Sequence, residues 1–168
     1  IFTGKFVGEN TLVRHSHLAQ NAQTGVPITD QFGRCSDDLY FATGNMLHPA
    51  ETGEQCFAEG LLVGKNVANC LAGKLPKAAQ IVPIVLKDAR LRVVYPAQIA
   101  LHQAREISLN FRTNAHLCGE IVVRLGEEVI HRQTKNCLAE QGFALKNMRL
   151  PEKIAAQIPL NISITANN

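Results

Sequence analysis

Residues 39–72 read LYFATGNMLHPAETGEQCFAEGLLVGKNVANCLA, and this stretch decides the fold of the first half of the chain. Its opening residues, 40–43, form a short apolar run that predicts a buried strand ending at Gly44 and Asn45. After a break, apolar residues recur at three- and four-residue steps, which is the spacing of an amphipathic helix. The stretch therefore predicts a strand, a glycine turn and one long helix.

Both ends of this helix carry local signals. Thr52 and Gln55 have the spacing of a capping box, in which each side chain satisfies a backbone donor of the other. Gly73 is suited to the left-handed cap that follows a last helical turn, and Pro76 prevents the helix from resuming. We expect the helix to lie between these signals.

The helix also has one face of small and apolar residues, made of Phe57, Gly60, Leu61, Gly64, Val67, Ala68 and Leu71. Glycine inside a helix costs about 1 kcal/mol relative to alanine. Two glycines on one face therefore predict that this face is packed and that another backbone comes close to it. A strand, turn and helix N-terminus can also cradle a polar ligand, although the same arrangement serves equally to pack a helix on a sheet.

Three segments around the turn resemble a known family. They are DQFGRCS at 30–36, LYFATGN at 39–45 and HPAET at 48–52. Together they are similar to the last FAD-binding segment of the pyridine nucleotide-disulfide oxidoreductases, over residues 1–75. In that family a strand ends beside the flavin, an acidic residue after a glycine binds the ribityl chain, and the next helix points its N-terminus at the isoalloxazine ring. The resemblance implies a flavin-dependent oxidoreductase reduced by NAD(P)H.

The resemblance also assigns cofactor-binding positions. Gly44 would let the backbone approach FAD, and Asn45 would bind the ribityl chain. His48 would hydrogen-bond a flavin carbonyl or lie near the substrate, or it is a turn residue that faces solvent. Glu51 and Thr52 would lie beside the cofactor at the helix N-terminus, where a carboxylate is favourable even without a catalytic role. No catalytic residue and no metal ligand is indicated.

Two departures from the family pattern affect this expectation. Asn45 replaces the usual aspartate, which keeps hydrogen-bonding capacity and removes the charge. The chain also has no G-x-G-x-x-G after a strand, the turn that cradles a dinucleotide pyrophosphate. We therefore expect a C-terminal portion whose nucleotide-binding parts lie upstream of Ile1 or on a partner subunit. Alone, the chain is expected to bind no FAD, to be inactive and to associate with copies of itself, for example as a homodimer.

Composition limits the remaining classes. The chain has 168 residues, of which 46% are hydrophobic and 18% are charged, so it can fill one ordinary core or two small ones. A net charge of +3, with scattered basic residues, argues against nucleic-acid binding. No apolar run reaches the ~20 residues that span a bilayer, and no signal peptide is present, so we expect a cytoplasmic protein.

The five cysteines include no C-x-x-C pair. Cys35 and Cys56 either approach one another beside the cradle or, like the others, are reduced and partly buried thiols. His15 and His17 have a spacing that can chelate a metal from a strand, although a solvated loop fits their polar surroundings better. Residues 1–4 read as the end of a strand, and residues 26–32 as one further strand.

After a linker at 74–80 the pattern changes to period two. Apolar residues alternate with polar ones around 91–93, 107–111, 121–125 and 160–165, a glycine turn at 126–127 predicts a hairpin with 129–132, and Phe143 and Leu145 indicate another strand. Short strands with one apolar face each bury that face by pairing two sheets. We predict an α+β protein in which a partial α/β FAD-binding segment, 1–75, precedes a small immunoglobulin-like β-sandwich in the domain 76–168.

The sequence thus supports two functions. In the first, the leading segment completes the FAD site of an oxidoreductase and the sandwich is accessory. In the second, the chain is a non-catalytic interaction or dimerisation module without bound cofactor.

Overall fold

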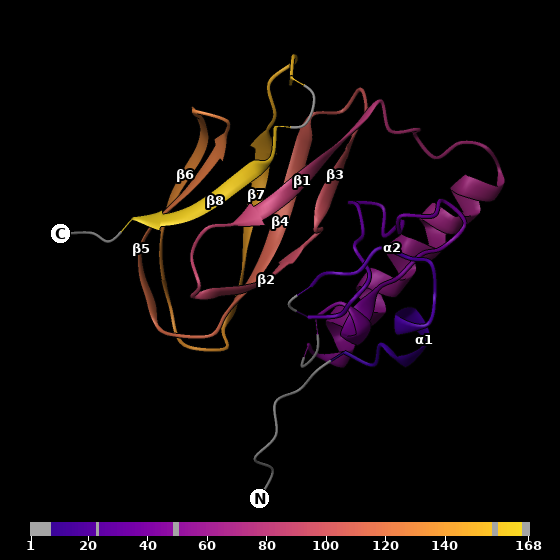
Figure 1. The fold of residues 1–168 in the computed structure, drawn as a ribbon, viewed down its shortest axis with the longest axis horizontal. Helices are drawn as coiled ribbons and strands as arrows, with labels where there is room; N and C mark the ends of the chain where they lie inside the picture. The colour runs from indigo at the N-terminus through magenta and orange to yellow at the C-terminus, as the bar shows by residue number, and fades with distance from the viewer. Residues whose placement is uncertain (1–7, 23, 49–50, 156–157, 166–168) are drawn as a thin grey trace, which may run out of the picture. The chain divides into compact units, whose positions relative to one another are not determined.

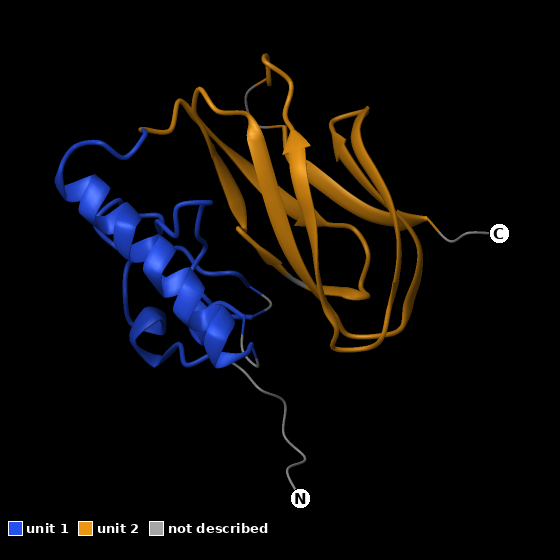
Figure 2. Cartoon of the chain, turned by 180° about the vertical axis from the view of Figure 1, so that it is seen from behind, with its two compact units in different colours: residues 1–76 blue, residues 77–168 orange. Residues whose placement is uncertain are grey.

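The computed structural model describes residues 8–22, 24–48, 51–155 and 158–165 and divides the chain into two compact units, residues 1–76 and 77–168 (Figure 2). The sequence places the boundary one residue earlier. The helical elements, all in unit 1, are α1 (Thr11–Arg14), the 3-10 turn η1 (Gly44–Met46) and α2 (Gly53–Leu71). The strands, all in unit 2, are β1 (Gln80–Leu86), β2 (Leu91–Tyr95), β3 (Gln98–Leu101), β4 (Glu106–Thr113), β5 (Leu117–Leu125), β6 (Glu128–Cys137), β7 (Gly142–Arg149) and β8 (Leu160–Thr165).

Unit 1 consists of one long helix and folded loops (Figure 1). Its described residues contain no strand of a sheet, only two isolated bridges, Gln20 with Pro27 and Arg34 with Phe41. The strands predicted over 26–32 and 40–43 are therefore wrong as sheet strands, because each segment meets only a short neighbouring loop. The predicted strand end at 1–4 and the break at Pro49 lie outside the described residues.

The predicted helix is confirmed at both ends as α2. The Gln55 amide donates to the Thr52 hydroxyl at 3.2 Å, and the Thr52 amide donates to the Gln55 side-chain oxygen at 3.4 Å, so the capping box is present. Gly73 follows the helix with φ +68°. This left-handed conformation is the cap that glycine adopts without strain.

The predicted packed face of α2 is wrong. Phe57, Leu61 and Leu71 on that face are 69%, 53% and 86% exposed, and Cβ atoms built at Gly60 and Gly64 would meet nothing within 4 Å. The apolar pattern locates the apolar side of the helix but not the side that the chain covers.

The covered side of α2 has mixed character. Val63 is buried, and the half-buried residues are Cys56, Glu59, Gly60, Asn66, Val67 and Cys70, of which only Gly60 and Val67 belong to the predicted face. Val63 is 5% exposed, and a Cβ added at Gly33 would lie 2.7 Å from one of its methyl groups. Asn66 donates its side-chain amide to the Phe32 carbonyl at 3.0 Å. The close backbone approach therefore comes from Gly33 in the loop, and the helix supplies a valine.

Unit 2 is a two-sheet structure. A five-stranded sheet has the order β3-β1-β8-β5-β6, and a three-stranded sheet has the order β2-β4-β7. Neighbours pair antiparallel except β1 and β8, which pair in parallel. The first and last strands of the unit are thus adjacent, as Figure 1 shows for the pink β1 and yellow β8.

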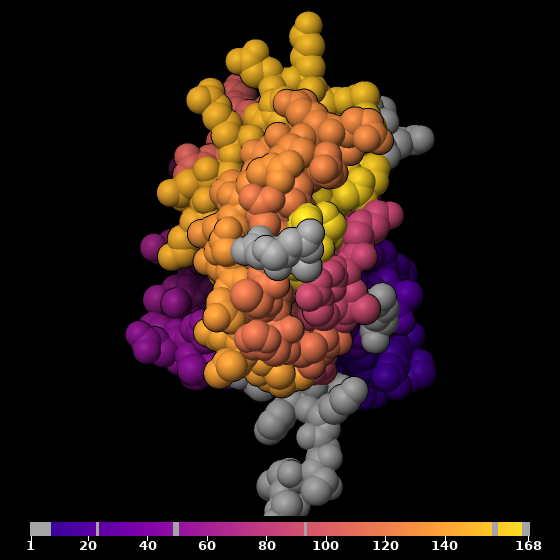
Figure 3. All heavy atoms as spheres, turned by 90° about the vertical axis from the view of Figure 1, so that its left-hand side faces the viewer, coloured from indigo at the N-terminus to yellow at the C-terminus, as the bar shows by residue number. Residues whose placement is uncertain are grey.

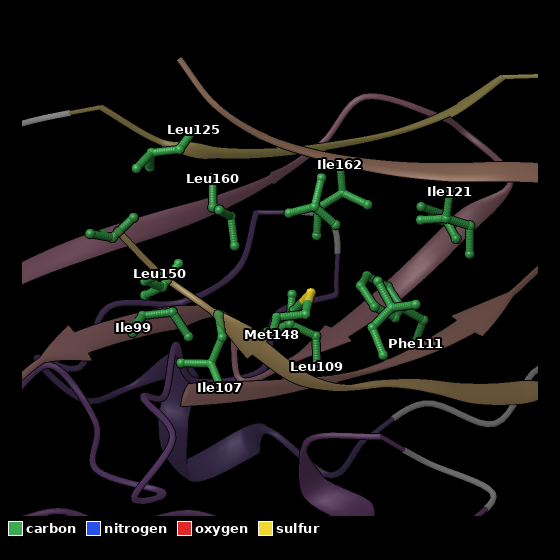
Figure 4. Packing of buried hydrophobic residues seen from close by; sticks show 14 of the residues in the cluster. Ile99, Ile107, Leu109, Phe111, Ile121, Leu125, Met148, Leu150, Leu160 and Ile162 are labelled. Carbon is green, nitrogen blue, oxygen red and sulfur yellow. The ribbon is translucent and has the colours of Figure 1, made fainter. Parts of the chain in front are cut away.

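Both sheets contribute to one hydrophobic core. β4 alternates exposed and buried residues as a half-buried strand does, and Leu109 and Phe111 on its inner side are 0% and 3% exposed. In Figure 4 their side chains point, with Met148 of β7, towards Ile121 and Ile162 of the other sheet. The side chains of β6 are exposed or half-buried except at Cys137, and they cover part of the surface seen in Figure 3.

The described chain is therefore mostly β with one long helix, in agreement with the coarse prediction. The β5–β6 hairpin around Gly126, which has φ +59°, is confirmed. None of the described helices is both long and apolar enough to cross a membrane.

Candidate functional site

A buried ion pair fixes the loop at the start of the candidate site. Asp30 and Arg34 are 2% and 6% exposed. One oxygen of Asp30 accepts Nε and Nη2 of Arg34 at 3.0 and 2.9 Å, while the other accepts the amides of Phe32 and Arg34 at 2.9 and 3.0 Å. Arg34 also donates from Nη1 to the Pro76 carbonyl at 3.2 Å. The pair joins the loop to the end of unit 1.

A short hairpin follows this loop. The Cys35 amide donates to the Tyr40 carbonyl at 2.9 Å, and the Ala42 amide donates to the Gly33 carbonyl at the same distance. Cys35 is 4% exposed, and burial, followed by the negative charges of Asp30 and Asp37, raises the pKa of its thiol to about 11. The thiol is therefore neutral and unreactive near pH 7.

Gly44 begins the turn that the sequence singles out. It is buried and has φ +69°, a conformation that favours glycine. A Cβ built there would lie 3.8 Å from Cβ and Sγ of Cys56 on α2, which is ordinary contact, so the conformation and not crowding within the chain selects glycine. Asn45 is exposed, and its side-chain oxygen accepts the Glu51 amide at 3.1 Å. Asn45 thus closes the loop before α2 and presents its amide group at the surface.

His48 is buried against α2, so the alternative of a solvent-facing turn residue is wrong. It is 6% exposed, and its Nε2 lies 3.0 Å from Oε2 of Glu59. That distance suits an ion pair when the imidazole is protonated. The contact ties the loop after η1 to the second turn of α2, and sequence reasoning missed it because Glu59 carries no motif.

Glu51 and Thr52 lie at the N-terminus of α2. Glu51 is half-buried, whereas Thr52 is exposed and engaged with Gln55, to which its hydroxyl lies at 3.1 Å. The Thr52 hydroxyl accordingly serves the helix cap in this structure. The partial positive charge of the α2 macrodipole lies at this same end of the helix, beside Thr52.

The two histidines considered for a metal do not form such a site. His17 lies with Nε2 2.7 Å from a carboxylate oxygen of Asp37 and packs edge-on against Tyr40, with ring centroids 5.3 Å apart. The Leu39 amide and then His17 lower the pKa of Asp37. Among the described residues, no group of three or more His, Cys, Asp or Glu side chains is arranged to hold a metal ion.

The structure therefore brings the five predicted residues, Gly44, Asn45, His48, Glu51 and Thr52, onto one turn and the N-terminus of the helix that follows it. Sequence reasoning missed Glu59 on α2, whereas Cys56 was considered beside the cradle and does lie near the Gly44 turn. The Asp30–Arg34 pair had a detectable signal, since opposite charges lie four residues apart around Gly33. What the arrangement offers chemically is a polar turn beside a helix N-terminus, which suits binding rather than covalent catalysis.

Comparison with known proteins finds no relative of this chain. The chain matches no protein-family model, no curated protein and no solved structure.

Proposed function

We propose that residues 1–75 are the C-terminal segment of an FAD-binding domain in a flavin-dependent NAD(P)H oxidoreductase, and that the sandwich of 76–168 is its accessory domain. The observation that carries this proposal is the Gly44 turn, with φ +69°, which leads through Asn45 to the capped N-terminus of α2. A left-handed glycine lets a ligand approach the backbone, and a helix N-terminus favours electron-rich groups.

The roles within this site follow the resemblance. Gly44 admits the cofactor, and the exposed amide of Asn45 binds the ribityl chain. His48, held by Glu59, hydrogen-bonds a flavin carbonyl from the buried side, while Glu51 and Thr52 border the ring. FAD supplies the redox chemistry when bound, with NAD(P)H as electron donor.

The remainder of the site belongs to an upstream part of the same protein or to a partner subunit. It must supply the glycine-rich pyrophosphate turn that this sequence lacks. We further propose a cytoplasmic location, for which the five free thiols are suited. We also propose an immunoglobulin-like class for the sandwich, for which its two mainly antiparallel sheets are suited.

The test compares two glycines with the same backbone conformation. In the complete flavoprotein, Gly44→Val should lose most of the flavin absorbance per protein, because a side chain blocks the approach. Gly73→Val imposes similar strain at φ +68° with open space around it, and should retain flavin. Equal flavin content in the two variants would contradict the assignment of Gly44.

A second candidate function, a non-catalytic interaction or dimerisation module, is favoured by a different observation. α2 exposes large apolar side chains that the described part of unit 1 does not cover, and contiguous exposed apolar surface marks interaction sites. A colourless protein that self-associates would support this function, whereas a yellow protein that retains flavin through purification would support the first.

A further inference from the structure

A thiol, an imidazole and a side-chain amide share the outer face of the five-stranded sheet. Leu117 of β5 is fully buried in the core, and its two neighbours in the chain, His116 and Cys118, are exposed. Because successive side chains of a strand point to opposite faces, His116 and Cys118 lie on one face. In the register of β5 with β6, Cys118 is opposite Asn136, which is also exposed. We call His116, Cys118 and Asn136 the β5–β6 cluster.

The ring of His116 extends along β5 towards Cys118. Nε2 of His116 lies 3.0 Å from Oδ1 of Asn136. The antiparallel register places Leu138, and not Asn136, directly opposite His116. The contact with Asn136 is therefore diagonal, and it leads to the pair position that Cys118 occupies. Diagonal neighbours on adjacent strands have their Cβ atoms about 7–8 Å apart or less, a span that an aromatic ring covers.

Asn136 also decides which nitrogen of the neutral ring carries the proton. A side-chain amide oxygen only accepts hydrogen bonds, so Nε2 of His116 is the donor in this contact. In a neutral imidazole the other nitrogen, Nδ1, then keeps its lone pair and can accept a proton. A nucleophile, a base and a third group that orients the base are the three parts of an activated thiol.

The charges beside the cluster are compatible with a thiolate. Glu120 is the next residue of β5 on the same face, and a free carboxylate there would disfavour a second negative charge. Its carboxylate is bound by Arg132 of β6 at 2.5 Å. Thr134, the residue opposite Glu120, is uncharged. An exposed thiol next to an imidazole, with the neighbouring carboxylate already paired, has the surroundings of a reactive cysteine.

We propose that Cys118 is a modification site that exchanges with small disulfides such as oxidised glutathione, with His116 as its base and Asn136 as the residue that positions His116. The exposed thiol turns about χ1 towards the ring, and Nδ1 of His116 takes its proton. The thiolate attacks one sulfur of the disulfide, the S–S bond breaks, and the leaving thiolate takes the proton from the imidazolium. One disulfide is consumed and one is formed, so the step needs no other oxidant.

This proposal does not depend on flavin, because all three residues belong to unit 2. The test treats the full chain with oxidised glutathione at pH 7 and follows each cysteine by mass spectrometry of its peptide. Cys118 should form the mixed disulfide at least about tenfold faster than Cys56 and Cys70, which are half-buried. Equal or slower modification of Cys118 would overturn the proposal.

Two histidine variants separate assistance by the base from exposure alone. His116→Gln leaves the thiol exposed and removes the base, so the exchange at Cys118 should slow about tenfold or more. His131→Gln changes a histidine of the same strand pair that is opposite Val123, away from the cluster, and should leave the rate unchanged. Circular dichroism checks that both variants are folded. An unchanged rate in His116→Gln would overturn the role of His116 and with it the proposal.

Asn136 has its own test, because its role is to position His116. Asn136→Ala removes the acceptor and should slow the exchange at Cys118. Asn136→Asp keeps an oxygen that accepts the Nε2 proton of His116, so it should restore most of the rate. An effect on the strand pair alone would not distinguish the two substitutions in this way. Equal rates in both variants would therefore overturn the positioning role of Asn136.

Discussion

At the scale of single residues, the Asp30–Arg34 pair is the strongest test of what holds unit 1. Both side chains are buried, at 3% and 7% exposure. Arg34→Met should destabilise unit 1 by about 3–5 kcal/mol, because it leaves a buried carboxylate without its partner. Hydrogen exchange of unit 1 peptides measures this change.

The control for Arg34 is an exposed ion pair. Arg132 contacts Glu120 with side-chain exposures of 51% and 30%. Arg132→Met should cost less than about 1 kcal/mol, since solvent screens such pairs. Equal effects on the two units would show that the Asp30–Arg34 pair is not the anchor of the loop.

Cys35 gives a pH-dependent prediction at the same scale. Its pKa is raised to about 11 from an ordinary 9.0, chiefly by burial. The stability that the neutral thiol contributes is therefore complete below pH 9 and is lost as the pH rises through about 11. At pH 8, iodoacetamide should modify the exposed Cys118 well before Cys35. Mass spectrometry of the tryptic peptides follows both, and faster labelling of Cys35 would contradict its burial.

Single residues also show what a sequence can reveal about the site. A glycine before a polar residue and a helix cap predicts a special backbone conformation, and Gly44 has φ +69°. The contact between His48 and Glu59 was not predictable, because it joins a loop to a helix face that has no apolar signature. Features set by neighbouring residues can be predicted from the sequence, whereas contacts between residues far apart in the chain require the structure.

At the scale of elements, α2 was predictable at its ends and not on its faces. Capping signals act within four residues, so Thr52 and Gly73 define the bounds. The covered face is the one on which Val63 packs closely against Gly33, thirty residues earlier in the chain. The periodicity of the helix sequence does not predict that contact.

The docking of α2 onto the loop can be tested with two glycines. Gly33→Ala places a Cβ 2.7 Å from Val63 in a backbone with φ +78°, so strain and overlap add. Gly73→Ala carries a similar φ of +68° with open space around it. The first change should destabilise unit 1 by at least about 1–3 kcal/mol more than the second. Thermal unfolding followed by hydrogen exchange distinguishes them, and similar losses would mean that Val63 can move aside.

The alternation of apolar and polar residues was sufficient to predict those strands that bury one face. β4 and β8 alternate and were predicted, while β1, QIVPIVL, contains Pro83 and a continuous apolar run, and β3 has only four residues. Strand order depends on pairing between distant segments, so the parallel contact of β1 with β8 was not predictable from pattern.

At the scale of the whole molecule, the two units should behave differently when the chain is cut. Among the residues that the structure describes, every member of the core cluster of unit 2 lies between Val82 and Ile164, so we expect this core to form without unit 1. We expect limited proteolysis to leave residues 81–166 intact as an independent unit. Early cleavage throughout that range would contradict a two-part architecture.

The most demanding test removes either end of the chain. Deletion of residues 1–76 leaves every strand of unit 2 in place, so the product should remain folded and unfold cooperatively. Deletion of residues 158–168 is shorter but removes β8, the middle strand of the order β3-β1-β8-β5-β6. The two remaining strand pairs then have no partner between them, and Leu160 and Ile162, both 0% exposed, leave the core.

Loss of two fully buried branched side chains costs several kcal/mol, at about 2–5 each, which is comparable to the whole stability of a small domain. The shorter deletion should therefore unfold the sandwich, whereas the longer one should not. Circular dichroism and the dispersion of amide resonances report both outcomes. A folded sandwich without residues 158–168 would mean that β1 and β5 can pair directly, and that the central position of β8 is not required for the fold.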